Sequence, residues 1–322
     1  PKNMKEAHEI RQMILTQIKL GSFDYGKQFP NSPKAMKYGK NIADKITIEE
    51  RLNEWLRLNQ KRLQLSTMRD YVSAINCHLI PQFGHLYLSE LTTTDVRNWI
   101  SRQNISNKRI NNILIPLRAI YEDAYEEEII TKNPLRRIKS LNVVTREPNP
   151  FTDTEINAIL NQLKGNDRNL IQFAFETGLR TSELVGLYWE DIDFEQKRIY
   201  VRRAIVRNKV KEPKTRSGIR TVDLSQDAIN ALKGQKEISR LSIENVFFDT
   251  KNKVRLDDQK IRKRIWKPAL IEANVTYREP YQTRHTFASK QLSSGKPVLW
   301  VSTQMGHSNP IMTTSKYARW IK

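Results

Sequence analysis

The chain has 322 residues, of which 55 are Lys or Arg and 35 are Asp or Glu, which gives a formal net charge of +20 and an isoelectric point of about 9.9. This surplus predicts a surface with a positive electrostatic field that attracts a polyanion such as nucleic acid. The mean hydropathy is −0.64, and no apolar run approaches the roughly 20 residues that a bilayer requires, which excludes a membrane protein.

Sulfur and imidazole groups are too sparse for disulfide or metal chemistry. Cys77 is the one cysteine, so no internal disulfide can form, and we expect a reducing compartment, the cytoplasm. That cysteine and the five histidines are scattered without the spacing of metal ligands, so the sequence predicts no zinc site. We expect the protein to need no metal and no other cofactor.

The first segment, residues 1–44, is predicted to combine a helix with a linker. Apolar residues recur at helical spacing between Ile10 and Ile18, and the pattern stops at Gly21. The stretch GSFDYGKQFPNSPKAMKYG, which begins there, is rich in Gly, Pro and Asn, as linkers are. Composition alone also allows an ordinary frayed terminus followed by a linker.

Residues 45–141 are predicted to form a compact domain of four helices. Apolar residues keep a spacing of three and four within four stretches, which are residues 48–56, 68–79, 96–100 and 110–124. Pro81 and Gly84 are expected to break the second helix. Thr94 or Asp95 is expected to cap the third helix.

A basic connection marked by proline follows these helices. Arg136, Arg137 and Lys139 precede Pro148 in a stretch with few apolar residues that could anchor a core. Such charges can follow the backbone of a nucleic acid, although a solvated linker often has the same composition. We place the linker between two domains at residues 142–149. The three basic residues are predicted to bind DNA.

The last segment, residues 150–322, is predicted to form an α+β domain. After its first helices, an alternating pattern predicts one strand across residues 199–206, a second from Val210 and a third at residues 220–224. Helical patterns resume near Asp257 and continue to the end. The expected fold class is therefore mainly α with a small antiparallel β-sheet.

Four residues of this last segment stand in local contexts that suit chemistry at a phosphate. They are Arg180 in TGLRTSEL, Arg284 in YQTRHTFAS, His307 in QMGHSNP and Tyr317 in TTSKYARW. Two guanidinium groups and an imidazole can hold the oxygens of a pentavalent phosphorane, and a phenol is a competent nucleophile once its proton is removed. Each residue type alone is usually structural, so the combination carries the hypothesis.

This series of motifs resembles the tyrosine recombinase, or phage integrase, family over residues 46–322. The phrase IPQFGHLYLSELTTTDV is similar to the connection between the second and third helices of that family's core-binding domain. The resemblance implies a helical core DNA-binding domain at residues 45–141 and a catalytic domain at residues 150–322. The linker stretch resembles the segment after the family's arm-binding domain, so residues 1–44 are expected to be the remnant of such a domain in a fragment.

The resemblance also implies a role for each of the four residues. Arg180 and Arg284 are expected to grip the scissile phosphate. His307 is expected to contact a nonbridging oxygen. Tyr317 is expected to attack the phosphorus and form a 3′-phosphotyrosyl link with a free 5′ hydroxyl, which conserves the phosphodiester energy and requires neither metal nor ATP.

A basic hairpin is expected to complete the site. Within EPKTRSGIRTVDL, the resemblance makes Lys214 the acid that protonates the leaving 5′ oxygen, and Arg216 is predicted to contact DNA. Taken alone, such a basic turn is most often a solvated surface. Glu183, one helical turn after Arg180, is expected to orient a neighbour rather than react.

The sequence departs from the family pattern at one position. The pattern places a histidine three residues before the second arginine, and here that position holds Tyr281. An unperturbed phenol stays protonated near neutral pH, so we expect Tyr281 to donate a hydrogen bond instead of acting as a base. His285 is adjacent to Arg284 and points about 100° away from it around the helix, so we expect it to serve packing or capping rather than to replace the missing histidine.

The expected function is site-specific recombination that integrates or excises a mobile element of a bacterium or phage. The expected partners are double-stranded DNA attachment sites, three further copies of the chain in a homotetramer, and DNA-bending and directionality proteins. Bound to DNA, the protein would associate with the bacterial nucleoid. The alternatives are a dimer-resolving recombinase, a type IB topoisomerase-like enzyme, and a DNA-binding regulator with an inactive site.

Overall fold

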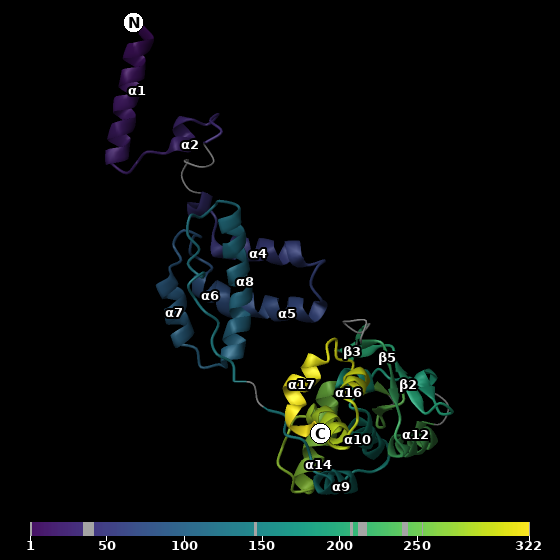
Figure 1. The fold of residues 1–322 in the computed structure, drawn as a ribbon. Coiled ribbons are helices and arrows are strands. Elements are labelled where there is room, and N and C mark those ends of the chain that lie inside the picture. The colour runs from purple at the N-terminus through teal and green to yellow at the C-terminus, as the bar shows by residue number, and fades with distance from the viewer. Residues whose placement is uncertain are drawn as a thin grey trace. The chain divides into compact units, whose positions relative to one another are not determined.

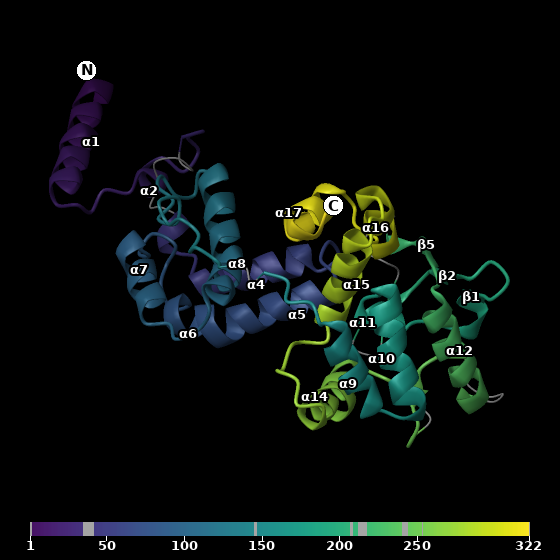
Figure 2. The ribbon, with the colours of Figure 1, turned by 60° about the horizontal axis from the view of Figure 1, so that its bottom comes forward.

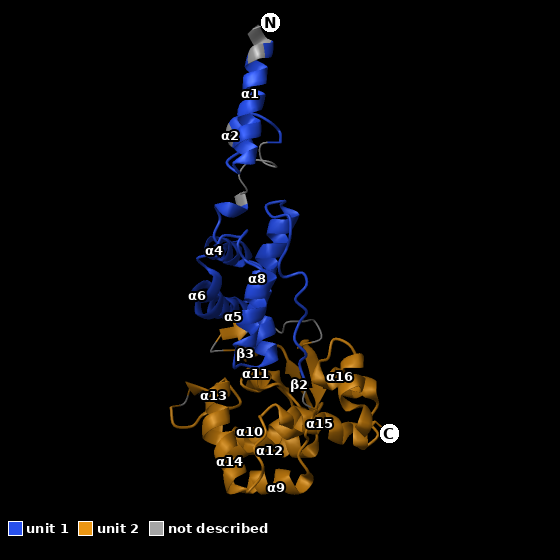
Figure 3. Cartoon of the chain, turned by 90° about the vertical axis from the view of Figure 1, so that its left-hand side faces the viewer, with its two compact units in different colours: residues 1–145 blue, residues 146–322 orange. Residues whose placement is uncertain are grey.

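The computed structural model describes residues 2–34, 42–144, 147–206, 209–211, 218–239, 244–252 and 254–321. The chain divides into two compact units, residues 1–145 and residues 146–322 (Figures 1 and 3). Both units are mainly helical, and the described strands are short and antiparallel, which confirms the predicted fold class. No helix in the described ranges is long and apolar enough to cross a membrane.

The first unit begins with the predicted amino-terminal helix. Helix α1 spans Lys2–Lys19, and the chain turns at Gly21, whose φ of 66° is a left-handed conformation that favours glycine. A short helix, α2, follows at Tyr25–Gln28. The described part of the linker stretch ends at residue 34.

The rest of the first unit contains the four predicted helical stretches. Their elements are η1 (Ile42–Asp44), α4 (Ile48–Asn59), α5 (Leu65–Ala74), the π-helix η2 (Ile75–Leu79), α6 (Ile80–Phe83), α7 (Thr93–Ser101) and α8 (Asn107–Glu126). The apolar faces of these helices meet in one core, in which α8 contributes the fully buried Leu117, Ile120 and Tyr121. The Tyr121 hydroxyl donates to the carbonyl of Leu88 at 3.1 Å, so the buried phenol has a partner.

Two predictions for this unit are wrong. Pro81 does not break its helix, because the chain widens into the π-helical turn η2 and continues as α6, with Pro81 in the first turn, up to Gly84. A proline lacks the N–H and crowds the preceding turn, and a wider turn relieves that crowding. Thr92 caps α7, instead of Thr94 or Asp95, and Asp95 completes a capping box with it.

The second unit alternates helices with short strands. Its first part contains α9 (Asp153–Asn161), α10 (Gly165–Thr177), α11 (Thr181–Leu184), η3 (Trp189–Asp191), β1 (Ile192–Asp193), β2 (Arg198–Val201), β3 (Ala204–Val206), β4 (Lys209–Lys211), β5 (Arg220–Asp223) and α12 (Gln226–Ser239). Its second part contains β6 (Phe248–Asp249), β7 (Val254–Arg255), α13 (Asp258–Lys260), the π-helix η5 (Ile261–Trp266), α14 (Lys267–Glu272), α15 (Gln282–Ser293), α16 (Val298–Met305), α17 (Ile311–Tyr317) and η6 (Ala318–Trp320).

The strand prediction for residues 199–206 needs a correction. These residues form two strands in different sheets: β2 lies between β1 and β5, and β3 pairs, within the part of the chain that the structure describes, only with β4. The chain leaves the first sheet at Arg203, whose guanidinium binds Asp191 at 2.7 Å and lies 4.0 Å above the ring of Tyr188. These contacts hold the connection away from the straight path of one strand.

Helix α10 packs against α12 on one side and against α15 on the other (Figure 2). Gly178, which follows α10, makes the approach to α15 close. Its φ is 61°, and an added Cβ would lie 2.6 Å from Cδ1 of Phe287. Helices α15, α16 and α17 meet in a small core of their own beside the main one.

We predict that Gly178→Ala destabilises the second unit more than Gly295→Ala. Both glycines have positive φ, 61° and 84°, but an added Cβ at Gly295 has no atom within 4 Å. Gly295→Ala should cost about 1–2 kcal/mol for the left-handed backbone. Gly178→Ala should cost about 1–3 kcal/mol more because Phe287 must move. Urea unfolding measures both losses, and equal losses would contradict the close approach.

Candidate active site

Arg180, Glu183 and Arg220 form a network of charged groups. Arg180 is the N-cap residue of α11; its backbone N–H donates to Glu183 Oε2 at 2.9 Å and its Nη1 donates to Oε1 at 2.7 Å. From β5, Arg220 donates to the same two oxygens at 2.9 and 3.1 Å. Its Nε donates to the carbonyl of Gln304, in α16, at 2.7 Å. One carboxylate therefore contacts two arginines, and the network joins three elements.

Glu183 remains ionised in this network. Its side chain is 4% exposed, and burial alone would raise the pKa of the carboxyl. The hydrogen bonds from Arg220 and the charges of Arg220, Arg180 and Arg284 outweigh burial and lower the pKa to about 2. Three guanidinium groups thus act on one carboxylate, and the surplus positive charge suits an anionic ligand.

Arg284 is held between the ends of two helices. It lies in α15 and is 1% exposed. Its Nη1 donates to the carbonyl of Gly178 at 2.8 Å, and its Nη2 donates to the carbonyl of Met305. These carbonyls end α10 and α16, where a helix leaves acceptors without partners and where its dipole is negative. The helix ends therefore both orient the guanidinium and stabilise its charge.

Arg284 also keeps a donor for a ligand. Among the described residues, no group accepts a hydrogen bond from its buried Nε. Burial, then the charge of Arg180, lowers the pKa of Arg284 to about 10, so the group is still charged at neutral pH. A buried donor without a partner costs about 1–3 kcal/mol, and an oxyanion at this position would remove that cost.

His307 follows Gly306, the left-handed residue that ends α16. Its Nδ1 lies 2.7 Å from Oγ1 of Thr313, in α17, and Arg180 Nη2 donates to the Gly306 carbonyl at 3.4 Å. Burial, followed by the charges of Arg284 and Arg180, lowers the pKa of His307 to about 4, so the ring is neutral at pH 7. When Thr313 donates to Nδ1, the ring proton is on Nε2, which can then donate to a phosphate oxygen.

Tyr317 is the last residue of α17 and is 1% exposed. Its ring belongs to the same small core as Phe287 and Met305, and its hydroxyl forms a 2.5 Å hydrogen bond with Nδ1 of His285. Burial raises the pKa of Tyr317, and the charge of Arg284 opposes that rise. The phenol is therefore protonated at neutral pH, and its oxygen can act as a nucleophile only when the proton leaves.

The expectation that His285 serves packing or capping did not include the contact that the structure shows between its Nδ1 and the Tyr317 hydroxyl. Tyr281, the residue in the usual histidine position, is the N-cap residue of α15 and is 45% exposed. Its ring meets His285 edge-on, with ring centroids 5.1 Å apart. Tyr281 thus covers one side of His285, and its role as a hydrogen-bond donor stays a prediction.

Sequence reasoning missed two residues of this site. Arg220 lies within EPKTRSGIRTVDL, and its alternation with the apolar Val222 and Leu224 is a signal in the sequence that places it on the buried face of β5. His285 gave no such signal, since its contact with Tyr317 depends on how α17 returns to α15.

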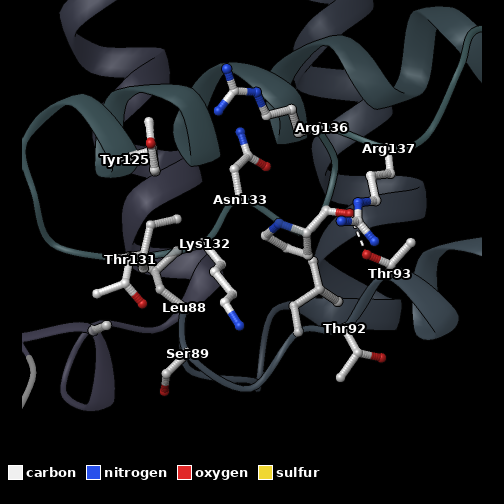
Figure 4. Close-up of a pocket in the computed structure, with 14 residues that line it drawn as sticks. Leu88, Ser89, Thr92, Thr93, Tyr125, Thr131, Lys132, Asn133, Arg136 and Arg137 are labelled. Carbon is white, nitrogen blue, oxygen red and sulfur yellow. Dashed lines mark hydrogen bonds between the residues drawn. The ribbon is translucent and has the colours of Figure 1, made fainter.

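The other predicted site residues lie elsewhere or cannot be placed. Lys214 and Arg216 lie outside the described residues. Arg136 and Arg137 line a cavity of about 680 Å³ in the first unit, together with polar side chains that include Lys132 (Figure 4). Lys139 does not line this cavity but a neighbouring hollow, which Arg137 also borders. These basic groups gather where the chain leaves α8, so they suit the backbone of a nucleic acid.

Family models match three parts of the chain. Residues 150–321 match the phage integrase family, residues 47–103 match its N-terminal SAM-like domain, and residues 1–33 match an arm DNA-binding domain. The chain belongs to the phage integrase family. It is thus a member of the tyrosine recombinase family that its four motifs resemble, and the predicted resemblance is confirmed.

Curated relatives agree with this family assignment. The chain is 29% identical to the prophage integrase IntR of Escherichia coli K12, in an alignment that covers 99% of this chain and 87% of the relative. It is 32% identical to a XerC-like tyrosine recombinase of Caldanaerobacter subterraneus, over 70% of this chain and 65% of the relative.

Solved integrases share the fold of this family member. The Tn1549 transposon integrase in complex with transposon right end DNA has a TM-score of 0.72 at 23% identity, and the match covers 84% of this chain and 95% of that chain. A lambda integrase dimer bound to a core site has a TM-score of 0.69 at 17% identity, and the match again covers 84% of this chain and 95% of that chain. At these identities the likeness concerns the fold.

We predict that Glu183→Gln lowers the stability of the second unit by an amount that depends on pH. A pKa lowered from 4.5 to about 2 in the folded state contributes about 3 kcal/mol at pH 7. This contribution is complete above the unfolded value and is lost as pH falls toward the folded value. The difference between the two proteins in urea unfolding should thus shrink below pH 4.5 and fall to less than half by pH 3. A difference that stays constant over this range would contradict the charge network.

Proposed function

We propose that the protein is a site-specific DNA recombinase that cuts and rejoins DNA strands through Tyr317. The observation that carries this proposal is the surplus of buried positive charge beside that tyrosine. Arg284 is 1% exposed and has an Nε donor without a partner among the described residues. Arg180 donates a hydrogen bond to the carbonyl of Gly306, the residue that precedes His307. A phosphodiester supplies the negative charge and the acceptor oxygens that such a site lacks.

Each residue has one role in the proposed reaction. Arg180 and Arg284 donate hydrogen bonds to the nonbridging oxygens, and His307 donates a further one from Nε2. The hydroxyl of Tyr317 gives up its proton to a base as its oxygen attacks phosphorus, and the bond to the 5′ oxygen breaks while Lys214 protonates that oxygen. The 3′-phosphotyrosyl bond keeps the phosphodiester energy, so the reverse attack by a 5′ hydroxyl reseals a strand.

The proposed biological role is integration or excision of a mobile element. The relatives support it, since one is a prophage integrase and others are transposases of Tn916 and Tn1545. Exchange of two duplexes needs four cleavages, so the proposed assembly is a homotetramer on double-stranded attachment sites. A solved lambda integrase tetramer on a Holliday junction supports this assembly. DNA-bending and directionality proteins are proposed as further partners in the cytoplasm.

We predict that Tyr317→Phe binds DNA as the unaltered protein does but forms no covalent adduct. Only the nucleophilic oxygen is lost, because the ring keeps its apolar contacts. The measurement uses candidate attachment-site duplexes with a nick beside the scissile phosphate, which trap the adduct. Tyr121→Phe is the matched control, since it removes another buried hydroxyl with one hydrogen bond, to Leu88, and should leave the adduct intact. An adduct in the Tyr317→Phe variant would exclude Tyr317 as nucleophile.

We also predict that Arg137 contributes one phosphate contact. With a charge of +20, binding to duplex DNA should weaken steeply as salt rises. Arg137→Ala should reduce the slope of log K against log salt by about 1. Lys290→Ala removes the same charge from an exposed residue that is already paired with Asp153, and should leave the slope unchanged. Equal slopes for the two variants would show that Arg137 does not bind DNA.

A further inference from the structure

The Tyr317 hydroxyl has one hydrogen-bond partner among the described residues, and that partner is Nδ1 of His285. The contact is 2.5 Å long and joins α17 to α15, residues 32 apart in sequence. The two rings lie with their centroids 5.6 Å apart and are tilted by 54° to each other. His285 is 9% exposed, and the ring of Tyr281 meets its ring edge-on, with the ring centroids 5.1 Å apart.

The direction of this hydrogen bond follows from the charges around it. The titratable and charged groups that act on His285 are Tyr281 and Arg284, from α15, and Lys316 and Tyr317, from α17. Burial, then Lys316 and Arg284, lowers the pKa of His285 to about 4. The ring is thus neutral at pH 7. Because burial keeps the phenol protonated, Tyr317 donates and the lone pair of Nδ1 accepts.

We propose that His285 is the general base of strand cleavage, which removes the proton of Tyr317 as its oxygen attacks the phosphate. This inference rests on the proposed function, in which Tyr317 is the nucleophile. In the step, the bond from the phenol oxygen to phosphorus forms, the bond from phosphorus to the 5′ oxygen breaks, and the phenol proton moves to Nδ1 of His285. The 5′ oxygen takes its proton from Lys214. In resealing, the imidazolium returns the proton to the departing phenol oxygen.

The arrival of DNA makes His285 a stronger base. Without a ligand, Lys316 and Arg284 disfavour the imidazolium. A phosphate bound to the arginines brings a negative charge that offsets theirs, and this raises the pKa of the imidazole toward the operating pH. His285 therefore gains proton affinity only when a substrate is in place.

The other candidates for this role are in the wrong place. The Nδ1 of His307 is engaged by Thr313 Oγ1 at 2.7 Å. Tyr281 occupies the position where the family pattern has a histidine, but a phenol is a poor base near neutral pH. His285, four residues after Tyr281, supplies an imidazole one helical turn further along α15.

The test measures adduct formation on the nicked duplexes for the full chain and for His285→Asn. The amide oxygen of asparagine can accept the hydrogen bond near the position of Nδ1 but cannot take the proton. We expect the variant to be slower by a factor of about 100 to 10,000 at pH 7, the scale of general-base catalysis. The deficit should shrink as pH rises, because hydroxide then removes the proton. A deficit below about tenfold, or one that is the same at every pH, would overturn the proposal.

A second measurement does not depend on whether this variant folds. Nitrogen NMR of the unaltered, histidine-labelled chain reports which ring nitrogen of His285 carries the proton, and Tyr317→Phe identifies its signal among the five histidines. The proposal requires an unprotonated Nδ1 and a protonated Nε2 at pH 7. A proton on Nδ1 would mean that His285 donates to the phenol, and the proposal would fail.

The outcomes separate this inference from the proposed function. If the unaltered chain forms no adduct, or if the adduct persists in Tyr317→Phe, the proposed function fails and the inference fails with it. If the adduct requires Tyr317 and forms at a normal rate in His285→Asn, the proposed function stands and His285 is not the base. If the adduct requires Tyr317 and the variant shows the deficit that depends on pH, both stand.

Discussion

The rest of the site depends on the ion pairs that the carboxylate of Glu183 forms with Arg180 and Arg220. Arg180, Arg220 and Arg284 bring three like charges close together, and their repulsion would spread them apart without a counter-charge. Glu183 binds the first two directly and acts on the third through its field. Arg220 also donates a hydrogen bond to the carbonyl of Gln304, so hydrogen bonds connect α11, β5 and α16.

The ends of helices position the remaining cation. Gly178 and Gly306 turn the chain with φ of 61° and 62°, which leaves the last carbonyls of α10 and α16 open. The Nη groups of Arg284 donate hydrogen bonds to both carbonyls, so one guanidinium caps two helices and is itself held in place. The fold thus orients Arg284 by backbone acceptors, and its Nε has no partner among the described residues.

Tyr317, the proposed nucleophile, is held differently from the arginines that are proposed to bind the phosphate. Tyr317 is stored in an apolar cluster with its hydroxyl on a neutral imidazole, and burial keeps the phenol protonated. A free tyrosinate in a positive site would bind the arginines and block them. In the proposed function, storage as the neutral phenol keeps the arginines available until DNA arrives.

The sequence by itself determined most of the elements and the local contexts of the candidate site residues. Helical spacing and strand alternation depend on neighbours along the chain, and the contexts of Arg180, Arg284, His307 and Tyr317 are local strings, so each could be predicted without coordinates. Local reasoning failed at Pro81, where the preceding π-helical turn makes room for the proline so that the helix continues. Such compensation depends on the whole helix.

Only the tertiary structure decided how these groups contact one another. Arg220 reaches Glu183 because β5 pairs with β2 in a register that buries every second side chain, and nothing local to Arg220 states its partner. His285 meets Tyr317 because α17 returns to α15 after 32 residues. A hydrogen bond or an ion pair depends on ångström distances between segments, and sequence spacing fixes distances only within one helix or strand.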